Sequence, residues 1–128
     1  MNKYMILAAG GAIGTLLRFS VADITHKLTG GTFPWGTLAV NLSGSFIIGL
    51  LWGIFSVKAL SPDLRNFVFI GILGGYTTFS TFTIECFNLI RDNHLKLAVL
   101  NLLASNILGI VLVFAGFFIS KSALNFIR

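Results

Sequence analysis

The chain has 128 residues, of which 55% are hydrophobic and 10% are charged. Soluble domains carry about 25% charged residues, so this composition excludes an ordinary soluble or disordered protein. The mean hydropathy of +0.91 indicates an integral membrane protein. The net charge of +5 does not indicate nucleic-acid binding, because the nine lysines and arginines are scattered singly and form no basic patch.

Charged residues divide the sequence into four apolar blocks, residues 5–22, 35–57, 67–90 and 97–120. A helix needs about 20 apolar residues to cross a bilayer, so each block predicts one transmembrane helix. The first block contains Arg18 and lacks a persuasive cleavage site, which indicates a retained helix rather than a signal peptide. We therefore expect an all-α integral membrane protein with a single four-helix domain over residues 1–128.

The predicted connections are short. Residues 23–34 contain Gly30, Gly31 and Pro34 and read as a loop, and residues 91–96 read as a tight polar turn. Between them, Ser61 caps the third helix and Pro62 begins it. His26 and His94 fall in these connections, where exposed histidines are expected rather than metal ligands.

Positive charge is almost balanced between the two sides of the membrane. The N-terminus, second connection and C-terminus carry five lysines and arginines, whereas the first and third connections carry three, or four with Arg18. Orientation in the membrane follows an asymmetry in this count. The near balance predicts that the chain inserts both ways up and pairs with an inverted copy of itself, as a dual-topology antiparallel homodimer.

The third block departs from a simple helix. Gly74 and Gly75 lie side by side near its middle and are followed by a run rich in threonine, serine and phenylalanine. Each glycine costs a helix about 1 kcal/mol relative to alanine. A break between residues 74 and 78 is therefore expected, and irregular backbone at membrane depth requires surrounding protein or water. Three glycine pairs with four-residue spacing, at 10/14, 49/53 and 71/75, predict close helix packing.

Polar residues recur on one face of three blocks. These stripes are Thr37, Asn41 and Ser45 in the second block, Thr78, Thr81 and Glu85 in the third, and Asn101 and Ser105 in the fourth. Any one hydroxyl in such a stripe is explained by helix packing, whereas an ionisable residue at membrane depth suggests function. Hydroxyl and amide donors suit an anion, and the positive edges of the Phe79 and Phe82 rings can face one.

The run from Gly74 to Glu85 resembles the GG-x-T-T-F-S-T-F-S-x-E signature of the Fluc (CrcB) fluoride channel family. The segment from Trp35 to Leu42 resembles the same family's P-x-G-T-L-x-V-N motif. The resemblance covers essentially the whole chain. It implies passive, electrogenic fluoride export across the cell inner membrane by an antiparallel homodimer with two pores, which reduces cytoplasmic fluoride.

The resemblance also implies roles for individual residues. Phe79 and Phe82 match the pore phenylalanines, and Asn41 matches the pore asparagine. Arg18 matches a vestibule arginine, and the backbone carbonyls of Gly74 and Thr77 match those that hold a structural sodium ion at the dimer interface. The polar track beside the rings is completed by Ser80, Thr81, Glu85, Thr37 and Ser105. Asn101 stands where the family often has tyrosine.

Two other functions remain open from the residues alone. A small dual-topology, proton-coupled multidrug antiporter would have the same size and span number, but needs a mid-membrane glutamate in its first span, where this chain has Arg18. A non-transporting scaffold explains the glycines but not the polar stripes. An enzyme is not expected, because no nucleophile–base pair or metal-ligand cluster is evident in the sequence.

Overall fold

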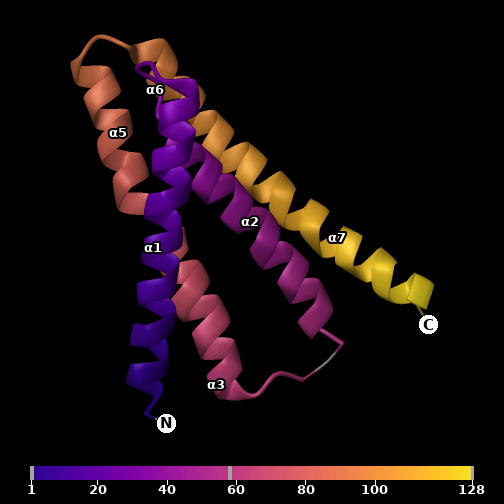
Figure 1. Ribbon diagram of the computed structural model, residues 1–128. Coiled ribbons are helices and arrows are strands. Elements are labelled where there is room, and N and C mark those ends of the chain that lie inside the picture. The colour runs from indigo at the N-terminus through magenta and orange to yellow at the C-terminus, as the bar shows by residue number, and fades with distance from the viewer. Residues whose placement is uncertain (1, 58, 128) are drawn as a thin grey trace.

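The computed structural model describes residues 2–57 and 59–127, and every regular element within these ranges is helical (Figure 1). Four runs are long and apolar enough to cross a membrane, which confirms the predicted all-helical, four-span fold class. The elements of these runs, in chain order, are α1 (Lys3–Thr29), α2 (Trp35–Phe55), α3 (Pro62–Arg65), η1 (Asn66–Leu73), α4 (Gly74–Tyr76), α5 (Phe79–Arg91), α6 (Leu95–Leu103), η2 (Ala104–Leu108) and α7 (Gly109–Ile127).

The first helix is longer than its apolar block predicts. Residues 23–29 were expected to form a loop but are helical, and within the helix Thr25 and Thr29 donate side-chain hydrogen bonds to carbonyls one turn earlier. Lys27 also pairs with Asp23 at 2.6 Å along the same helix face. The helix ends at Gly30, whose φ of +61° favours glycine. The prediction that His26 lies in a loop is therefore wrong, although its side chain is exposed.

The other helix ends lie near the predicted ones. The second run ends at Phe55, two residues early, and the fourth extends beyond its apolar block to cover residues 95–127. Ser61 caps α3 by accepting a hydrogen bond from the amide of Leu64 at 3.3 Å, and Pro62 is its first residue, as predicted. The segments η1 and η2 are π-helical, which the sequence pattern did not indicate.

Glycines bring the helices into close contact, as two examples show. A Cβ atom on Gly10 of α1 would lie 2.9 Å from the Cα of Gly71 in η1, so only glycine fits at this crossing. On α2, a Cβ on Gly49 would meet the backbone of Val113 in α7. Small residues permit this approach in lipid, where no hydrophobic force drives helices together. The predicted packing role of these glycines is confirmed.

The third run is interrupted between α4 and α5, beside the middle of α1 (Figure 1). The connections from α1 to α2 and from α5 to α6 lie at the top of that view, and the N-terminus and the start of α3 lie at the bottom. The four runs therefore alternate in direction, as transmembrane helices with short connections do. The interruption lies near the middle of the span Pro62–Arg91, where a bilayer around the span would require surrounding protein or a water-filled cavity for the irregular backbone.

Candidate functional site

The interruption consists of two extended residues. Thr77 has φ −79° and ψ 155°, and Thr78 has φ −149° and ψ 122°. The side chain of Thr78 then caps α5 by accepting from the amide of Thr81 at 3.4 Å. The break predicted between residues 74 and 78 is thus confirmed, with its extended part at the threonines that follow the glycine pair.

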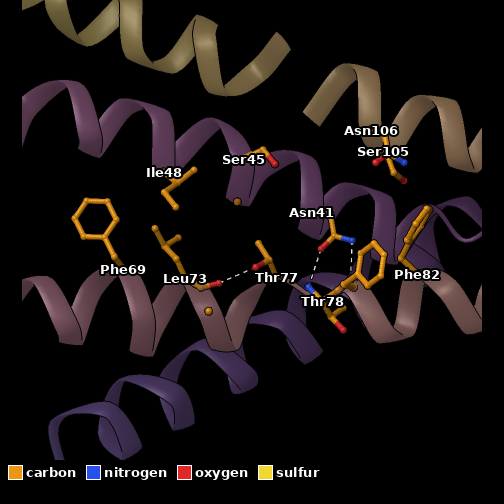
Figure 2. Close-up of a pocket in the computed structure, with 13 residues that line it drawn as sticks. Asn41, Ser45, Ile48, Phe69, Leu73, Thr77, Thr78, Phe82, Ser105 and Asn106 are labelled. Carbon is orange, nitrogen blue, oxygen red and sulfur yellow. Dashed lines mark hydrogen bonds between the residues drawn. The ribbon is translucent and has the colours of Figure 1, made fainter. Parts of the chain in front are cut away.

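Asn41 of α2 holds the break in place. Its Nδ2 donates to the carbonyl oxygen of Thr78 at 3.0 Å, and its Oδ1 accepts from the Thr78 amide at 2.8 Å (Figure 2). One side-chain amide therefore satisfies both backbone groups of an extended residue. Since Nδ2 carries two hydrogens, a second N–H remains available to another acceptor.

A cavity of about 340 Å³ opens beside this pair (Figure 2). Its walls come from α2, from both sides of the break and from η2. Of the residues expected in the pore or at the sodium site, it brings together Asn41, Gly74, Thr77, Phe79, Phe82 and Ser105. Its walls therefore combine the carboxamides of Asn41 and Asn106, several hydroxyls and three phenyl rings, Phe69 being the third, and no side chain with a formal charge lines it.

The two phenyl rings differ in their surroundings. Phe82 is buried at 6% exposure, whereas Phe79 is 75% exposed on the single chain. Their ring centroids lie 5.7 Å apart with the planes tilted by 50°. Both rings line the large cavity, and ring edges carry the positive end of the ring quadrupole. A further surface must cover Phe79 if it lines a closed pathway.

A second cavity, of about 220 Å³, lies between α1, α2 and α5. Arg18, Thr37 and Thr81 line it together with Thr78, which therefore contributes to both cavities. The Nε atom of Arg18 is buried without a hydrogen-bond partner. Arg18 thus points into protein, as expected from its helix face, and faces hydroxyl groups rather than the two rings.

Glu85 is the last residue of the polar stripe that also contains Thr78 and Thr81. Its Oε1 accepts a hydrogen bond from the hydroxyl of Thr37 at 2.6 Å, while its Oε2 is buried without a partner. It lines a third cavity, of about 280 Å³, which also contacts His26 and Asp92. Ser80 is exposed on α5 and lines none of these three cavities.

The fourth run contributes a buried polar network. Asn101 is only 1% exposed; its Nδ2 donates to Cys86 Sγ at 3.4 Å, and its Oδ1 accepts from the hydroxyl of Ser105 at 3.3 Å. Cys86 is half-buried and serves as an acceptor. The spacing of Asn101 and Ser105 predicted their shared face, whereas the link to Cys86 carried no sequence signal.

The backbone carbonyls at the break fit the oxygen ligands of a hard cation. In a continuous helix the Thr78 amide would donate to the carbonyl of Gly74, but here it donates to Asn41. The Thr81 amide, which would donate to the carbonyl of Thr77, instead meets the hydroxyl of Thr78. Gly74 and Thr77 both line the large cavity, so their carbonyls are freed from helix hydrogen bonding at a polar surface.

The sequence of the chain is similar to one protein family over most of its length. A family model described as CrcB-like protein, Camphor Resistance (CrcB), matches residues 5–117. A protein of Parabacteroides distasonis named Fluoride-specific ion channel FluC is 43% identical over 128 residues, which is the full length of both chains. Proteins of the same name from Magnetococcus marinus and Nitrosococcus oceani are 41% and 40% identical, over 90% and 94% of this chain and 94% and 97% of theirs.

Proposed function

The chain belongs to the CrcB family, and we propose that it is a fluoride-selective channel that lets fluoride leave the cell passively and electrogenically. The observation that carries this proposal is the 43% identity over the full length of a protein named as a fluoride-specific ion channel. The chain is accordingly a multi-pass protein of the cell inner membrane and a transport protein rather than an enzyme.

The chemistry of the large cavity supports an anion as the permeating species. Asn41 offers one free N–H, the Ser45 hydroxyl lines the same cavity, and Phe79 and Phe82 offer ring edges, whereas the hydroxyls of Thr77, Thr78 and Ser105 donate to protein acceptors in this structure. Such donors replace part of the hydration shell of a small anion without binding it tightly, and a conducted ion must also be able to leave. Arg18 and the hydroxyls of the second cavity would attract the anion before it reaches the rings.

The alternative is a proton-coupled antiporter. Glu85 is the carboxylate that such a mechanism would use, and it lies in the middle of α5, toward the end of the span Pro62–Arg91, with one oxygen held by Thr37. The first span has Arg18 where the antiporter class needs a glutamate. These two placements favour the channel.

We also propose that the active form is an antiparallel homodimer in the bilayer. The near balance of positive charge supports insertion in both orientations. Phe79, 75% exposed beside the cavity, supports a second copy as the missing wall. Each of the two pores would then be lined by residues from both subunits.

A structural sodium ion belongs to the same proposal. The freed carbonyls of Gly74 and Thr77 are the oxygen ligands that a hard cation prefers. One chain supplies two of them, so four would meet on the two-fold axis of the dimer. When bound, sodium would hold the two breaks together. Exchanging sodium chloride for N-methyl-D-glucamine chloride should lower the melting temperature of the purified dimer, whereas an unchanged temperature would contradict the site.

Anion efflux from liposomes tests the function directly. The purified protein is reconstituted in vesicles loaded with potassium fluoride or potassium chloride, and efflux is started with valinomycin. Fast fluoride release with little chloride release, unchanged by a proton gradient, is the expected result. Dimers that release no fluoride, or release it only with a proton gradient, would exclude the channel and return Glu85 and the antiporter to consideration.

A further inference from the structure

The hydrogen bonds of Asn101 can be arranged in two ways. In the structure its Oδ1 accepts from the hydroxyl of Ser105 at 3.3 Å, and its Nδ2 donates to Cys86 Sγ at 3.4 Å. A half-turn of the amide exchanges these atoms, which are nearly equal in size. Nδ2 would then donate to Ser105 Oγ, and Oδ1 would accept from the Cys86 thiol. Asn101 is 1% exposed, so no water competes for either arrangement.

The two arrangements direct the Ser105 proton differently. When Ser105 donates to Asn101, its proton points away from the large cavity that Ser105 lines. When the amide is turned, Ser105 only accepts from Asn101, and its proton is free to donate into the cavity. Both arrangements keep two hydrogen bonds within the network, so they differ little in energy. An anion in the cavity favours the second, because a hydrogen bond to an anion is stronger than one to a neutral acceptor.

We propose that Asn101 is a positioning residue whose amide turns when fluoride enters, so that Ser105 donates its proton to the ion and Cys86 takes up the exchanged hydrogen bond. The proposal rests on the fluoride channel function proposed above and deepens it. Asn101 does not line the cavity and acts only through Ser105. Cys86 lies on α5 and bonds to Asn101 across the contact between α5 and α6, so its hydrogen bond reverses direction when the amide turns. We call this coupled exchange at Ser105, Asn101 and Cys86 the relay.

Infrared spectroscopy of the thiol tests the turn itself. Cys86 is the only cysteine of the chain, so its S–H stretching band is free of other contributions. Adding fluoride to the reconstituted wild-type protein should move this band to lower wavenumber, because the thiol changes from accepting to donating. Chloride should leave the band in place, and so should fluoride added to the Asn101→Leu variant. If the S–H band of the wild-type protein keeps its wavenumber when fluoride is added, the proposal is overturned, because a purely structural role of Asn101 would produce no shift.

A double-mutant cycle on flux tests whether Asn101 acts through Ser105. Asn101→Leu removes the Nδ2 donor that orients Ser105 Oγ in the turned arrangement, and Ser105→Ala removes the donor to the ion, so each should slow fluoride efflux about 3- to 10-fold, the value of one hydrogen bond. The double variant should be no slower than Ser105→Ala alone. Independent, multiplying losses would overturn the proposal. Asn125→Leu, at an exposed position near the end of α7, is the matched control and should conduct normally.

Cys86 variants keep the test decisive if the leucine variant folds poorly. Cys86→Ser retains a group that both donates and accepts and should conduct at the wild-type rate. Cys86→Ala removes the exchange partner and should slow efflux. Equal rates for both would overturn the relay. If the wild-type protein itself releases no fluoride, the proposed function fails and the relay fails with it; if it conducts while the band and the cycle contradict the relay, only the relay fails.

Discussion

Asn41 does two things at once at the centre of the molecule. Two extended residues inside a transmembrane run leave backbone groups without helical partners, and an unpaired group in an apolar environment costs several kcal/mol. Asn41 removes that cost at Thr78 by pairing with both its amide and its carbonyl. Because the same side chain lines the large cavity, the group that stabilises the break also offers its remaining N–H to the contents of the cavity.

Replacing Asn41 should therefore destabilise the fold as well as impair conduction. Asn41→Leu keeps the volume but leaves both backbone groups of Thr78 unpaired, and we expect a loss of at least about 2 kcal/mol in the free energy of unfolding. Denaturant titration in detergent micelles measures this loss. Asn125→Leu, at an exposed position, is the control, and equal midpoints for the two variants would contradict the role of Asn41.

Substitution of either phenylalanine should abolish conduction, whereas only one of the two substitutions should lower stability appreciably. Phe79→Ile and Phe82→Ile both remove a ring edge and should reduce fluoride efflux to near background while the protein still assembles. Phe82→Ile should also cost about 1–2 kcal/mol, because Phe82 is buried, whereas exposed Phe79 should cost less than about 0.5 kcal/mol. Efflux and melting curves distinguish these outcomes. Phe126→Ile, at 95% exposure, is the control, and normal flux in both test variants would remove the rings from the pathway.

At the scale of elements, the sequence predicts the spans and the break but not the finer helix geometry. Apolar blocks define four spans because a bilayer sets their length, and the glycine pair at 74 and 75 marks the break. The extension of α1 to Thr29 was missed because residues 23–29 are mostly polar and lie outside the apolar block. In the structure the hydroxyls of Thr25 and Thr29 donate to helix carbonyls. The π-helical segments η1 and η2 follow from tertiary packing, which leaves no local pattern, yet η2 places Ser105 and Asn106 at the cavity.

Adjacent glycines in α1 provide a matched test of helix packing. A Cβ on Gly10 would lie 2.7 Å from the Phe67 carbonyl and 2.9 Å from the Gly71 Cα, both backbone atoms that cannot move aside. Gly10→Ala should push α1 away from η1 and cost about 1–3 kcal/mol. A Cβ on Gly11 meets nothing within 4 Å, so Gly11→Ala should be neutral or stabilising. Melting temperatures in detergent measure the difference, and equal effects would show that α1 does not pack as described.

The large cavity of the single chain has an incomplete wall. The cavity beside the break is open, Phe79 stands exposed at its edge, and all four runs carry exposed apolar residues. Lipid can cover the apolar residues, but it cannot satisfy the hydroxyls, the amide or the freed carbonyls of the cavity. A second copy in the inverted orientation would bring the same polar groups to the same depth. The charge balance and the incomplete cavity wall therefore both support the proposed antiparallel homodimer.

Orientation variants test that assembly. Lys3→Gln, Lys121→Gln, Thr29→Lys and His94→Lys together move two positive charges to the side of the first and third connections. Lys27→Gln, Lys96→Gln, Ser122→Lys and Asn125→Lys move two the other way. Each variant should insert in one orientation, which protease or labelling accessibility of a terminal tag measures.

Each orientation variant alone then lacks an inverted partner. Cells that express one variant should lose fluoride efflux and grow poorly in fluoride, while co-expression of the two should restore both, because only the mixture supplies chains of opposite orientation. The wild type, which supplies both orientations itself, is the reference. Full efflux from a single-orientation variant would exclude the antiparallel dimer and require an assembly of parallel chains.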